Sequence, residues 1–236
     1  MPTTMTEAEA IAAHLEPLKA GERIKWLYET YGDRVVASTS FGLQAAVMLH
    51  LIAENAPEIP VVFVDTGYLF PETYHYFETL SKELKVDLRR YHPQYSVAHQ
   101  TACWPELWAT DPQRYATINK VEPMDRALKD IGGDIWLSGL RRAQSSTRAD
   151  RPLAEQQNST LKVYPILDWA DAQVASHFYQ HNLPKHPLEA EGYVTMGDWH
   201  STRKPAQGES AEDTRFNGDK YECGLHELTG GSDYQI

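Results

Sequence analysis

The sequence predicts an α/β fold built on one twisted parallel sheet with helices on both faces. Segments with apolar residues at helical spacing alternate along the chain with short apolar or β-branched runs, as in βαβ units. One of these runs, residues 60–64, is apolar throughout, which is typical of a parallel strand buried on both faces. After Asn182 the periodicity fades and prolines and glycines become frequent, so we expect one domain followed by a C-terminal extension.

The individual elements follow in a regular order. Residues 6–31 are apolar at helical spacing, and Thr6 with Glu9 matches a capping box. A helix that opens with Pro71 and a helix N-capped by Asp168 are also predicted. We expect strands at 34–38, 60–64, 86–91, 135–137 and 162–165. The two helices just named span 71–85 and 168–182, and one further helix is expected at 43–55.

The composition excludes several function classes. The net charge of −11 over 236 residues argues against a general nucleic-acid binder, so an anionic ligand must meet a local basic cluster. No apolar run approaches the roughly 20 residues of a membrane span, and the N-terminus has no signal-peptide pattern. Two cysteines cannot form a disulfide framework, which fits a reducing cytoplasm.

Two predicted βα loops carry small polar residues where ligands bind to parallel sheets. The first loop, 38–44, offers the hydroxyls of Ser38 and Ser40, then Phe41 and Gly42, before the first free N–H groups of a helix. These groups suit an anion, although an ordinary well-capped turn has the same composition. The second loop contains Asp65, Thr66 and Gly67, for which a simple turn is an equally good interpretation.

A third loop, 139–148, is basic in an otherwise acidic chain. It contains Arg141, Arg142 and Arg148 together with three hydroxyl side chains. Guanidinium groups bind phosphate or sulfate with paired hydrogen bonds, so we expect an anion here, with a solvated basic loop as the alternative. The spacings of the ten histidines, among them His181, His186 and His200, match no zinc motif, so we expect no metal site.

The last residues place a cysteine where packing gives no reason for one. Cys223 lies in a polar stretch between Lys220 and His226, and we expect a mobile tail with a reactive thiolate. An incidental surface thiol is the alternative. The other cysteine, Cys103, lies among aromatic residues, and we expect it to be buried and inert.

Six short motifs occur in a fixed order over most of the chain, at residues 39–46, 65–73, 119–124, 139–142, 186–193 and 222–226. In this combination the chain resembles the phosphoadenylyl-sulfate (PAPS) reductases, the thioredoxin-dependent enzymes of assimilatory sulfate reduction. The resemblance implies a Rossmann-like sheet of the adenine-nucleotide α-hydrolase type. We expect a nucleotide-binding domain at 1–196, with a helical segment at 1–31, and an extension at 197–236 that carries Cys223.

The resemblance also implies a chemistry. Cys223 would attack the sulfur of PAPS, and thioredoxin or glutaredoxin would release sulfite from the resulting S-sulfocysteine. Lys120, Arg203, Arg215 and His226 are the candidates for the sulfonate, and Cys223, His226, Lys120 and Arg215 form the expected catalytic set. Arg141, Arg142 and Arg148 would bind phosphate, and loop 38–42 with Asp65 would bind the adenosine end. The family is commonly dimeric, but the sequence leaves the oligomeric state open.

One departure separates this chain from the related adenylyl-sulfate (APS) reductases, which hold an iron–sulfur cluster with four cysteines. The matching positions here are Tyr115, Ala116, Asp198 and Ser201, so we expect no cluster and no other cofactor. Three alternatives remain: a cluster-free APS reductase, a non-catalytic nucleotide-binding protein, and an ATP-pyrophosphatase of the same fold. The last would carry Ser-Gly-Gly-x-Asp-Ser in the first loop, which this chain lacks.

Overall fold

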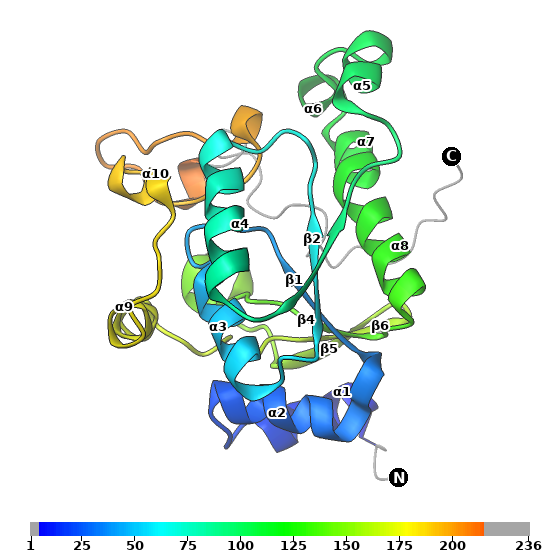
Figure 1. Cartoon of the computed structure of the whole chain (residues 1–236), viewed down its shortest axis with the longest axis vertical. Coiled ribbons are helices and arrows are strands. Elements are labelled where there is room, and N and C mark those ends of the chain that lie inside the picture. Colours follow the sequence, from blue (N-terminus) through cyan, green and yellow to red (C-terminus); the bar gives the residue numbers. More distant parts are fainter. Residues whose placement is uncertain (1–4, 215–236) are drawn as a thin grey trace.

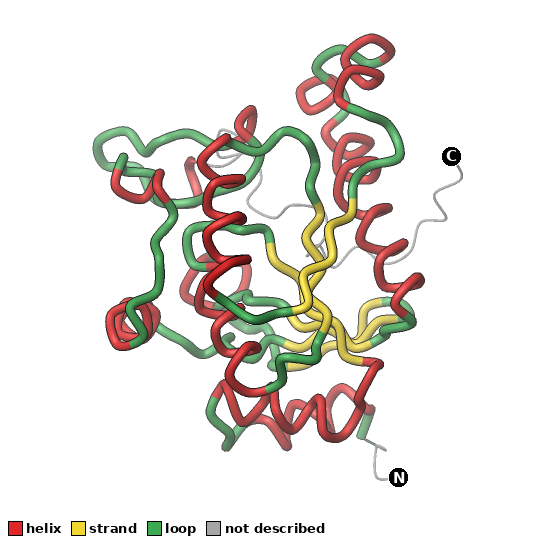
Figure 2. Tube along the Cα trace, viewed as in Figure 1, coloured by secondary structure: helices red, strands yellow, loops and turns green. Residues whose placement is uncertain are grey.

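A computed structural model describes residues 5–214, and residues 1–4 and 215–236 lie outside the described part. The described chain forms one six-stranded sheet in the order β3-β2-β1-β4-β6-β5. Figure 2 shows the strands at the centre with helices around them. The strands are β1 Val35–Thr39, β2 Pro60–Val64, β3 Asp87–Tyr91, β4 Ile135–Leu137, β5 Ala154–Gln157 and β6 Thr160–Val163.

Five strands are parallel, as predicted, and the sixth is not. β5 pairs antiparallel with β6 through a tight turn at Asn158, whose φ is +53°. A short hairpin of this kind needs only a turn, whereas a parallel strand needs a crossover. The sequence analysis did not predict β5, because residues 154–157 are mostly polar and show little apolar alternation.

Helices cover both faces of the sheet, in agreement with the predicted fold class. Figure 1 shows α8 on one side and α3 and α4 on the other, with α5 and α6 projecting from the top of the view. The helices are α1 Glu7–Leu15, α2 Ala20–Tyr31, α3 Ala45–Asn55, α4 Pro71–Glu83, α5 Val97–Cys103, α6 Leu107–Thr110, α7 Pro112–Ala116, α8 Glu122–Ile131, α9 Asp171–Gln180 and α10 Pro187–Ala190. None of the described helices is long and apolar enough to cross a membrane.

Side-chain alternation along the strands divides the core into two clusters. In β1, Val35 and Ala37 face the larger cluster, which includes the buried residues of α1–α4, whereas Val36 packs with Met124 and Trp136 on the α8 side. Both faces of the central strands are therefore buried, which explains why 60–64 is apolar throughout.

The N-terminal segment forms two helices rather than one. The capping box of Thr6 and Glu9 is present at the start of α1. Pro17 lies in the break between α1 and α2, because proline has no N–H to continue a helix. The Glu22 carboxylate then accepts a hydrogen bond from the Lys19 backbone N–H at 2.8 Å and stabilises the start of α2.

The predicted N-cap Asp168 is wrong, because α9 begins three residues later, after Ala170. The carboxylate of Asp168 instead forms a two-pronged ion pair with Arg23 of α2, with both N···O distances 2.8 Å. Arg23 is 2% exposed and also donates to the backbone carbonyls of Leu15 and Pro165. A buried guanidinium requires such partners, so the N-terminal helices are fixed to the loop that follows β6.

Candidate active site at the carboxyl edge of the sheet

The strand order places the three predicted loops at one edge of the sheet. β1 lies between β2 and β4, and the chain leaves β1 toward β2 and returns on the other side at β4. In open α/β sheets, ligands bind beyond the carboxyl ends of the strands at such a reversal of strand order. Strand β1 includes the first two residues of the predicted loop 38–44, so the first loop begins at Ser40. The third loop follows β4, and the Asp65 loop follows β2.

The first loop is anchored by Phe41. Its φ of +49° is unusual for a residue with a side chain, and its buried ring packs edge-on against Phe63 and Phe77 at 4.8 and 5.1 Å. This packing stabilises a backbone conformation that leaves Ser40 exposed. The buried ring of Phe41 therefore anchors the backbone of the first loop to the core.

The hydroxyl of Ser38 already has a protein partner. Trp136 Nε1 donates a hydrogen bond of 2.7 Å to Ser38 Oγ, which fixes this side chain on the α8 face of the sheet. Gly42 lies beside Met196, since a Cβ atom at position 42 would be in ordinary van der Waals contact with the Cβ atom of Met196, at 3.9 Å. Met196 precedes the 197–214 segment, so this later part of the chain returns to the first loop.

Arg141 is buried and joins the first loop to the third. Its side chain donates to Gln44 Oε1 at 2.6 Å, to the carboxylate of Asp171 at 2.8 Å and to the carbonyl of Trp169 at 3.0 Å. The Arg141 side chain is 1% exposed, and its guanidinium group is bound by these three protein groups. It therefore positions Gln44 at the start of α3, and a phosphate could reach it only by replacing these contacts.

Arg142 and Arg148 are the other two arginines of the third loop. Arg142 donates twice to the carbonyl of Arg151, at 2.8 and 3.1 Å, and Arg148 donates to Gln144 Oε1 at 2.7 Å. Gly139 is required at the start of this loop, because an added Cβ atom would lie 2.8 Å from the Met48 side chain. α3 therefore packs directly against the loop.

Asp65 organises the second loop. Its carboxylate accepts hydrogen bonds from the Gly67 backbone N–H at 2.9 Å and from Tyr74 Oη at 2.7 Å, and it forms an ion pair with Arg90. Burial raises the pKa of Asp65, but these donors outweigh burial and hold the pKa below its ordinary value. The ionised carboxylate thus stabilises the turn in which Gly67 has a φ of +77°.

Lys120 and Asp198 form a buried ion pair beside this loop. Lys120 Nζ lies 2.7 Å from Asp198 Oδ2, and the two side chains are 9% and 1% exposed. Asp198 also accepts hydrogen bonds from Thr66 Oγ1 at 2.6 Å and Tyr115 Oη at 3.1 Å. Burial raises the pKa of Asp198, but Lys120 and the hydroxyl donors outweigh it and lower the pKa to about 2. The pair therefore stays charged.

A widened helical turn places Lys120 in this network. Residues Thr117–Val121 form a π-helix between α7 and α8, and Pro123 follows in the first turn of α8. Proline lacks the N–H of a regular helical bond and clashes with the preceding turn, so the turn widens at this point. Asn119, one residue before Lys120, forms a reciprocal amide pair with Gln100 of α5, at 2.8 and 2.9 Å.

Aromatic rings cover this ion pair. The ring of His200, 4.0 Å from Asp198 through Nε2, stacks on Trp108 with the ring centroids 4.6 Å apart. Tyr115 and Tyr68 contact the same imidazole edge-on at 4.9 and 5.5 Å. These rings exclude water, which strengthens the electrostatic interaction inside the network.

The four positions that correspond to cluster cysteines converge in space. Tyr115 and Asp198 are hydrogen-bonded, Ser201 Oγ donates to the Asp198 carbonyl at 3.2 Å, and Ala116 follows Tyr115 directly. Although they are 83 residues apart in sequence, Tyr115 and Asp198 share one site. The Lys120–Asp198 ion pair and the phenol of Tyr115 thus lie where the family resemblance places the thiolates of the APS reductases.

The remaining predicted site residues are dispersed. Arg203 is partly exposed and pairs with Glu209 through two hydrogen bonds. Arg215, Cys223 and His226, like the predicted mobile tail, lie outside the described residues. The expectation that Cys103 is buried is wrong: it is exposed, because α5 buries Gln100 instead and turns its last residue outward.

Sequence reasoning missed the partners that position these groups. Asp198 was identified only as a non-cysteine, and its role as the counter-charge of Lys120 was not predicted. Gln44 and Arg90, which hold Arg141 and Asp65, were not singled out either. The only sequence feature that pointed to Asp198 was a charged residue beside aromatic ones, in Gly-Asp-Trp-His. Such a pattern does not identify a partner that is distant in sequence.

The topology and the loop cluster define a doubly wound α/β protein with an anion-compatible edge. Solved structures of Candida glabrata FMN adenylyltransferase share this fold, with a TM-score of 0.58 at 14% sequence identity over 94% of this chain and 80% of that chain. A phosphoadenylyl-sulfate (PAPS) reductase from Candida auris, solved as a phosphate complex, has a TM-score of 0.74 and 27% identity. It covers 85% of this chain and 99% of that chain.

Sequence comparison identifies the family. The model of the phosphoadenosine phosphosulfate reductase domain matches residues 34–204. A phosphoadenosine 5′-phosphosulfate reductase of Alkalilimnicola ehrlichii is 46% identical over 225 residues, covering 94% of this chain and 92% of the relative. One of Vibrio parahaemolyticus is 45% identical over 236 residues, covering 96% and 91%. The chain therefore belongs to the phosphoadenosine phosphosulfate reductase family.

Proposed function

We propose that this protein reduces PAPS to sulfite and adenosine 3′,5′-bisphosphate in sulfate assimilation, with thioredoxin or glutaredoxin as the reductant. The observation that carries the proposal is the 46% identity over 94% of the chain to a protein named for this activity. The three loops at the reversal of strand order support it, because ligands of open α/β sheets bind at such a place.

The adenosine and phosphate ends of the substrate would meet these loops. Ser40 is exposed and Gly42 is half-buried just before α3, where free N–H groups suit a phosphate. Arg142 donates to the carbonyl of Arg151 and Arg148 donates to Gln144 Oε1, and a phosphate would be a stronger acceptor than either of these neutral oxygens. Ser38, Phe41, Asp65, Thr66, Gly67 and Arg141 would shape or line the same site.

The first chemical step is a substitution at sulfur. The Cys223 thiolate attacks the sulfonate sulfur of PAPS, a sulfur–sulfur bond forms, and the sulfur–oxygen bond to the nucleotide phosphate breaks. The electron pair leaves with adenosine 3′,5′-bisphosphate, and Cys223 carries the S-sulfonate. Cations are needed to offset the anionic oxygens around the sulfur, and Lys120, Arg203, Arg215 and His226 are the candidates.

The second step uses a thiol of the partner protein. A thioredoxin or glutaredoxin thiolate attacks the Cys223 sulfur, and sulfite leaves with the electron pair of the sulfur–sulfur bond. A second partner thiol then resolves the mixed disulfide and restores Cys223. Two thiols are oxidised to one disulfide while the transferred sulfur is reduced by two electrons. The extension 197–236 is attached to the 1–196 domain through Asp198, and the part of the extension that carries Cys223 would present this thiol to substrate and partner in turn.

No iron–sulfur cluster is required for these steps. Two cysteines in the whole chain cannot supply the four thiolates of a cluster. Asp198, at one of the four corresponding positions, is engaged in an ion pair with Lys120, which supports a cofactor-free site. A reaction that consumes dithiols fits a reducing cytoplasm, and a homodimer is the assembly we expect from the family resemblance.

A direct assay tests the proposal. The protein, reduced thioredoxin and PAPS are mixed, and released sulfite is measured beside an identical reaction with APS. Sulfite from PAPS in excess of sulfite from APS supports the proposal. Preferential turnover of APS would make the protein a cluster-free APS reductase, and nucleotide binding without sulfite would make it a non-catalytic binder.

A further inference from the structure

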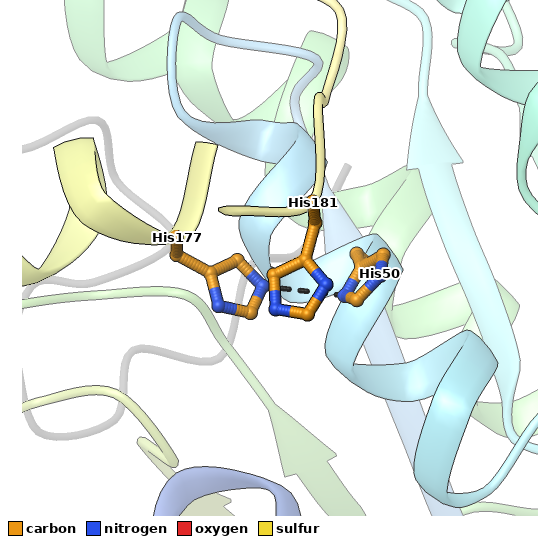
Figure 3. Close-up of side chains that lie close together, drawn as sticks. All are labelled: His50, His177 and His181. Atoms are coloured by element: carbon orange, nitrogen blue, oxygen red, sulfur yellow. Dashed lines mark hydrogen bonds between the residues drawn. The ribbon is translucent and has the colours of Figure 1, made fainter. Parts of the chain in front are cut away.

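Three histidines from two helices gather away from the loops described above. His50 lies in α3, and His177 and His181 lie one turn apart at the end of α9. Figure 3 shows the three imidazole rings close together, with His177 and His181 facing His50 across the contact between the two helices. One ring nitrogen from each residue can be chosen so that the three atoms all lie within 4.8 Å of one another.

A hydrogen bond accounts for only one of the three contacts. His177 Nε2 lies 3.2 Å from His50 Nδ1, so one of these nitrogens donates and the other accepts. His181 contacts the other two rings at centroid distances of 4.3 Å, and among the described contacts of residues 5–214 its ring has no hydrogen bond to either. Three titratable rings thus share a partly exposed space at the contact between α3 and α9, in which only His177 is buried.

One proton must move before all three rings can bind one cation. In the hydrogen bond between His177 and His50 one of the two nitrogens carries a proton, and this proton can shift to the other nitrogen of the same ring. Each neutral imidazole then offers one nitrogen with a free lone pair, so the three rings supply three ligand atoms.

We propose that His50, His177 and His181 bind a divalent transition-metal cation of the zinc class through three imidazole nitrogens. Zinc–nitrogen distances of about 2.0–2.1 Å in a tetrahedral site separate neighbouring ligand atoms by about 3.3 Å. The distance between His177 Nε2 and His50 Nδ1 already matches this separation. Magnesium and calcium prefer oxygen ligands, so an all-imidazole set selects against them.

The exposed histidine supplies the adjustment that the site needs. His181 is at the surface and is the C-cap of α9, so its side chain can rotate to close the remaining gap. The fourth position would be open to water, as in three-histidine zinc sites. A bound cation would link α9 to α3. α9 also begins with Asp171, the partner of Arg141, so the link would brace the third loop from behind.

Zinc titration of the untagged full-length protein tests the proposal. Competition with a chromophoric chelator should give one zinc ion per chain. His181→Asn should weaken zinc binding by more than about 100-fold, since even loss of an outer-shell partner costs 10–100-fold. His75→Asn, at an exposed position on α4 outside the cluster, is the matched control and should bind zinc like the unmodified protein.

Cobalt distinguishes this site from the thiols of Cys103 and Cys223, which also bind soft metals. Co²⁺ bound by imidazoles should give visible d–d bands without the intense near-ultraviolet band of a thiolate ligand. His50→Gln, a change on the other helix, should abolish these bands, and zinc should raise the Tm of the unmodified protein but not of His181→Asn. Unchanged zinc affinity in His181→Asn, or a thiolate band with cobalt, would overturn the proposal. None of these readouts depends on sulfite formation.

Discussion

The ammonium group of Lys120 and the carboxylate of Asp198 form a 2.7 Å ion pair in which both side chains are almost completely buried. The two residues come from distant parts of the chain, a π-helical turn and the segment after Met196. Thr66 and Tyr115 saturate the carboxylate with further hydrogen bonds. A buried charge of this kind is tolerated only while its partner remains in place.

Asp198→Asn should therefore destabilise the protein strongly. The substitution keeps the shape of the side chain but leaves the Lys120 ammonium buried without a counter-charge, at a cost of about 3–5 kcal/mol. Urea unfolding at pH 7 measures the free energy of unfolding. The matched control is Asp134→Asn, because Asp134 pairs with Arg34 in an ion pair whose side chains are 49% and 47% exposed. That change should cost less than about 1 kcal/mol, and equal losses in both variants would contradict the argument.

The stability contributed by Asp198 should disappear in acid. Its folded-state pKa of about 2 lies below the ordinary value of 3.8, so the unfolded chain takes up the proton first as pH falls. The contribution is complete above pH 4 to 5 and is lost as pH approaches 2. By pH 3 the difference in stability between the unmodified protein and Asp198→Asn should shrink by about 1 kcal/mol. A difference that stays constant from pH 6 to pH 3 would show that the carboxylate is not ionised in the folded protein.

Cys223→Ser should abolish sulfite formation while nucleotide binding survives, because the loops at the sheet edge do not include this residue. Calorimetric titration with adenosine 3′,5′-bisphosphate measures the binding, and sulfite release with thioredoxin measures the activity. Cys103→Ser is the control and should keep its activity, since Cys103 lies at the exposed end of α5. Turnover by Cys223→Ser would refute the proposed mechanism.

PAPS should be preferred over APS by more than about tenfold in kcat/KM. A charge-assisted hydrogen bond from arginine to the 3′-phosphate is worth on the order of 1.5–3 kcal/mol, which is one to two decades. Arg142→Ala or Arg148→Ala should reduce this ratio. Arg89→Ala, at a surface pair with Asp87, should leave it unchanged. If neither loop variant alters the ratio, the 3′-phosphate is recognised elsewhere.

Protein purified without oxygen should be colourless and contain no stoichiometric iron or sulfide. The positions that would hold a cluster carry Tyr115, Ala116, Asp198 and Ser201. Tyr115 and Ser201 both form hydrogen bonds to Asp198. Iron and sulfide analysis together with a visible spectrum decides the matter. Four irons per chain would show that other ligands assemble a cluster.

Patterns within one segment were predicted correctly from the sequence. The capping box at Thr6, the apolar strand 60–64 and the loops after three strands are local features, and the parallel sheet follows from their alternation. Helix boundaries were less accurate: Asp168 has a good N-cap composition but is recruited by Arg23, a tertiary contact that overrides local preference. The polar hairpin strand β5 has no apolar pattern to reveal it.

The candidate site was predicted by residue type but not by partner. Lys120 and Arg141 were identified as cations, yet each meets a carboxylate that lies in another segment of the chain. Pairing of this kind depends on where the folded chain returns, and a single sequence holds no signal for it. The histidine cluster shows the same limit, because His50 is 127 residues before the nearest of its two companions.

Arg23 has a consequence for the order of assembly during synthesis. Its partners Pro165 and Asp168 are 142 and 145 residues further along the chain, so α2 cannot complete its contacts until most of the domain has left the ribosome. Contacts of such long sequence separation slow folding, because the chain between them must first be ordered. Until that point α2 can pack only on earlier parts of the chain such as α3, so the Arg23 guanidinium remains without its Asp168 counter-charge during most of synthesis.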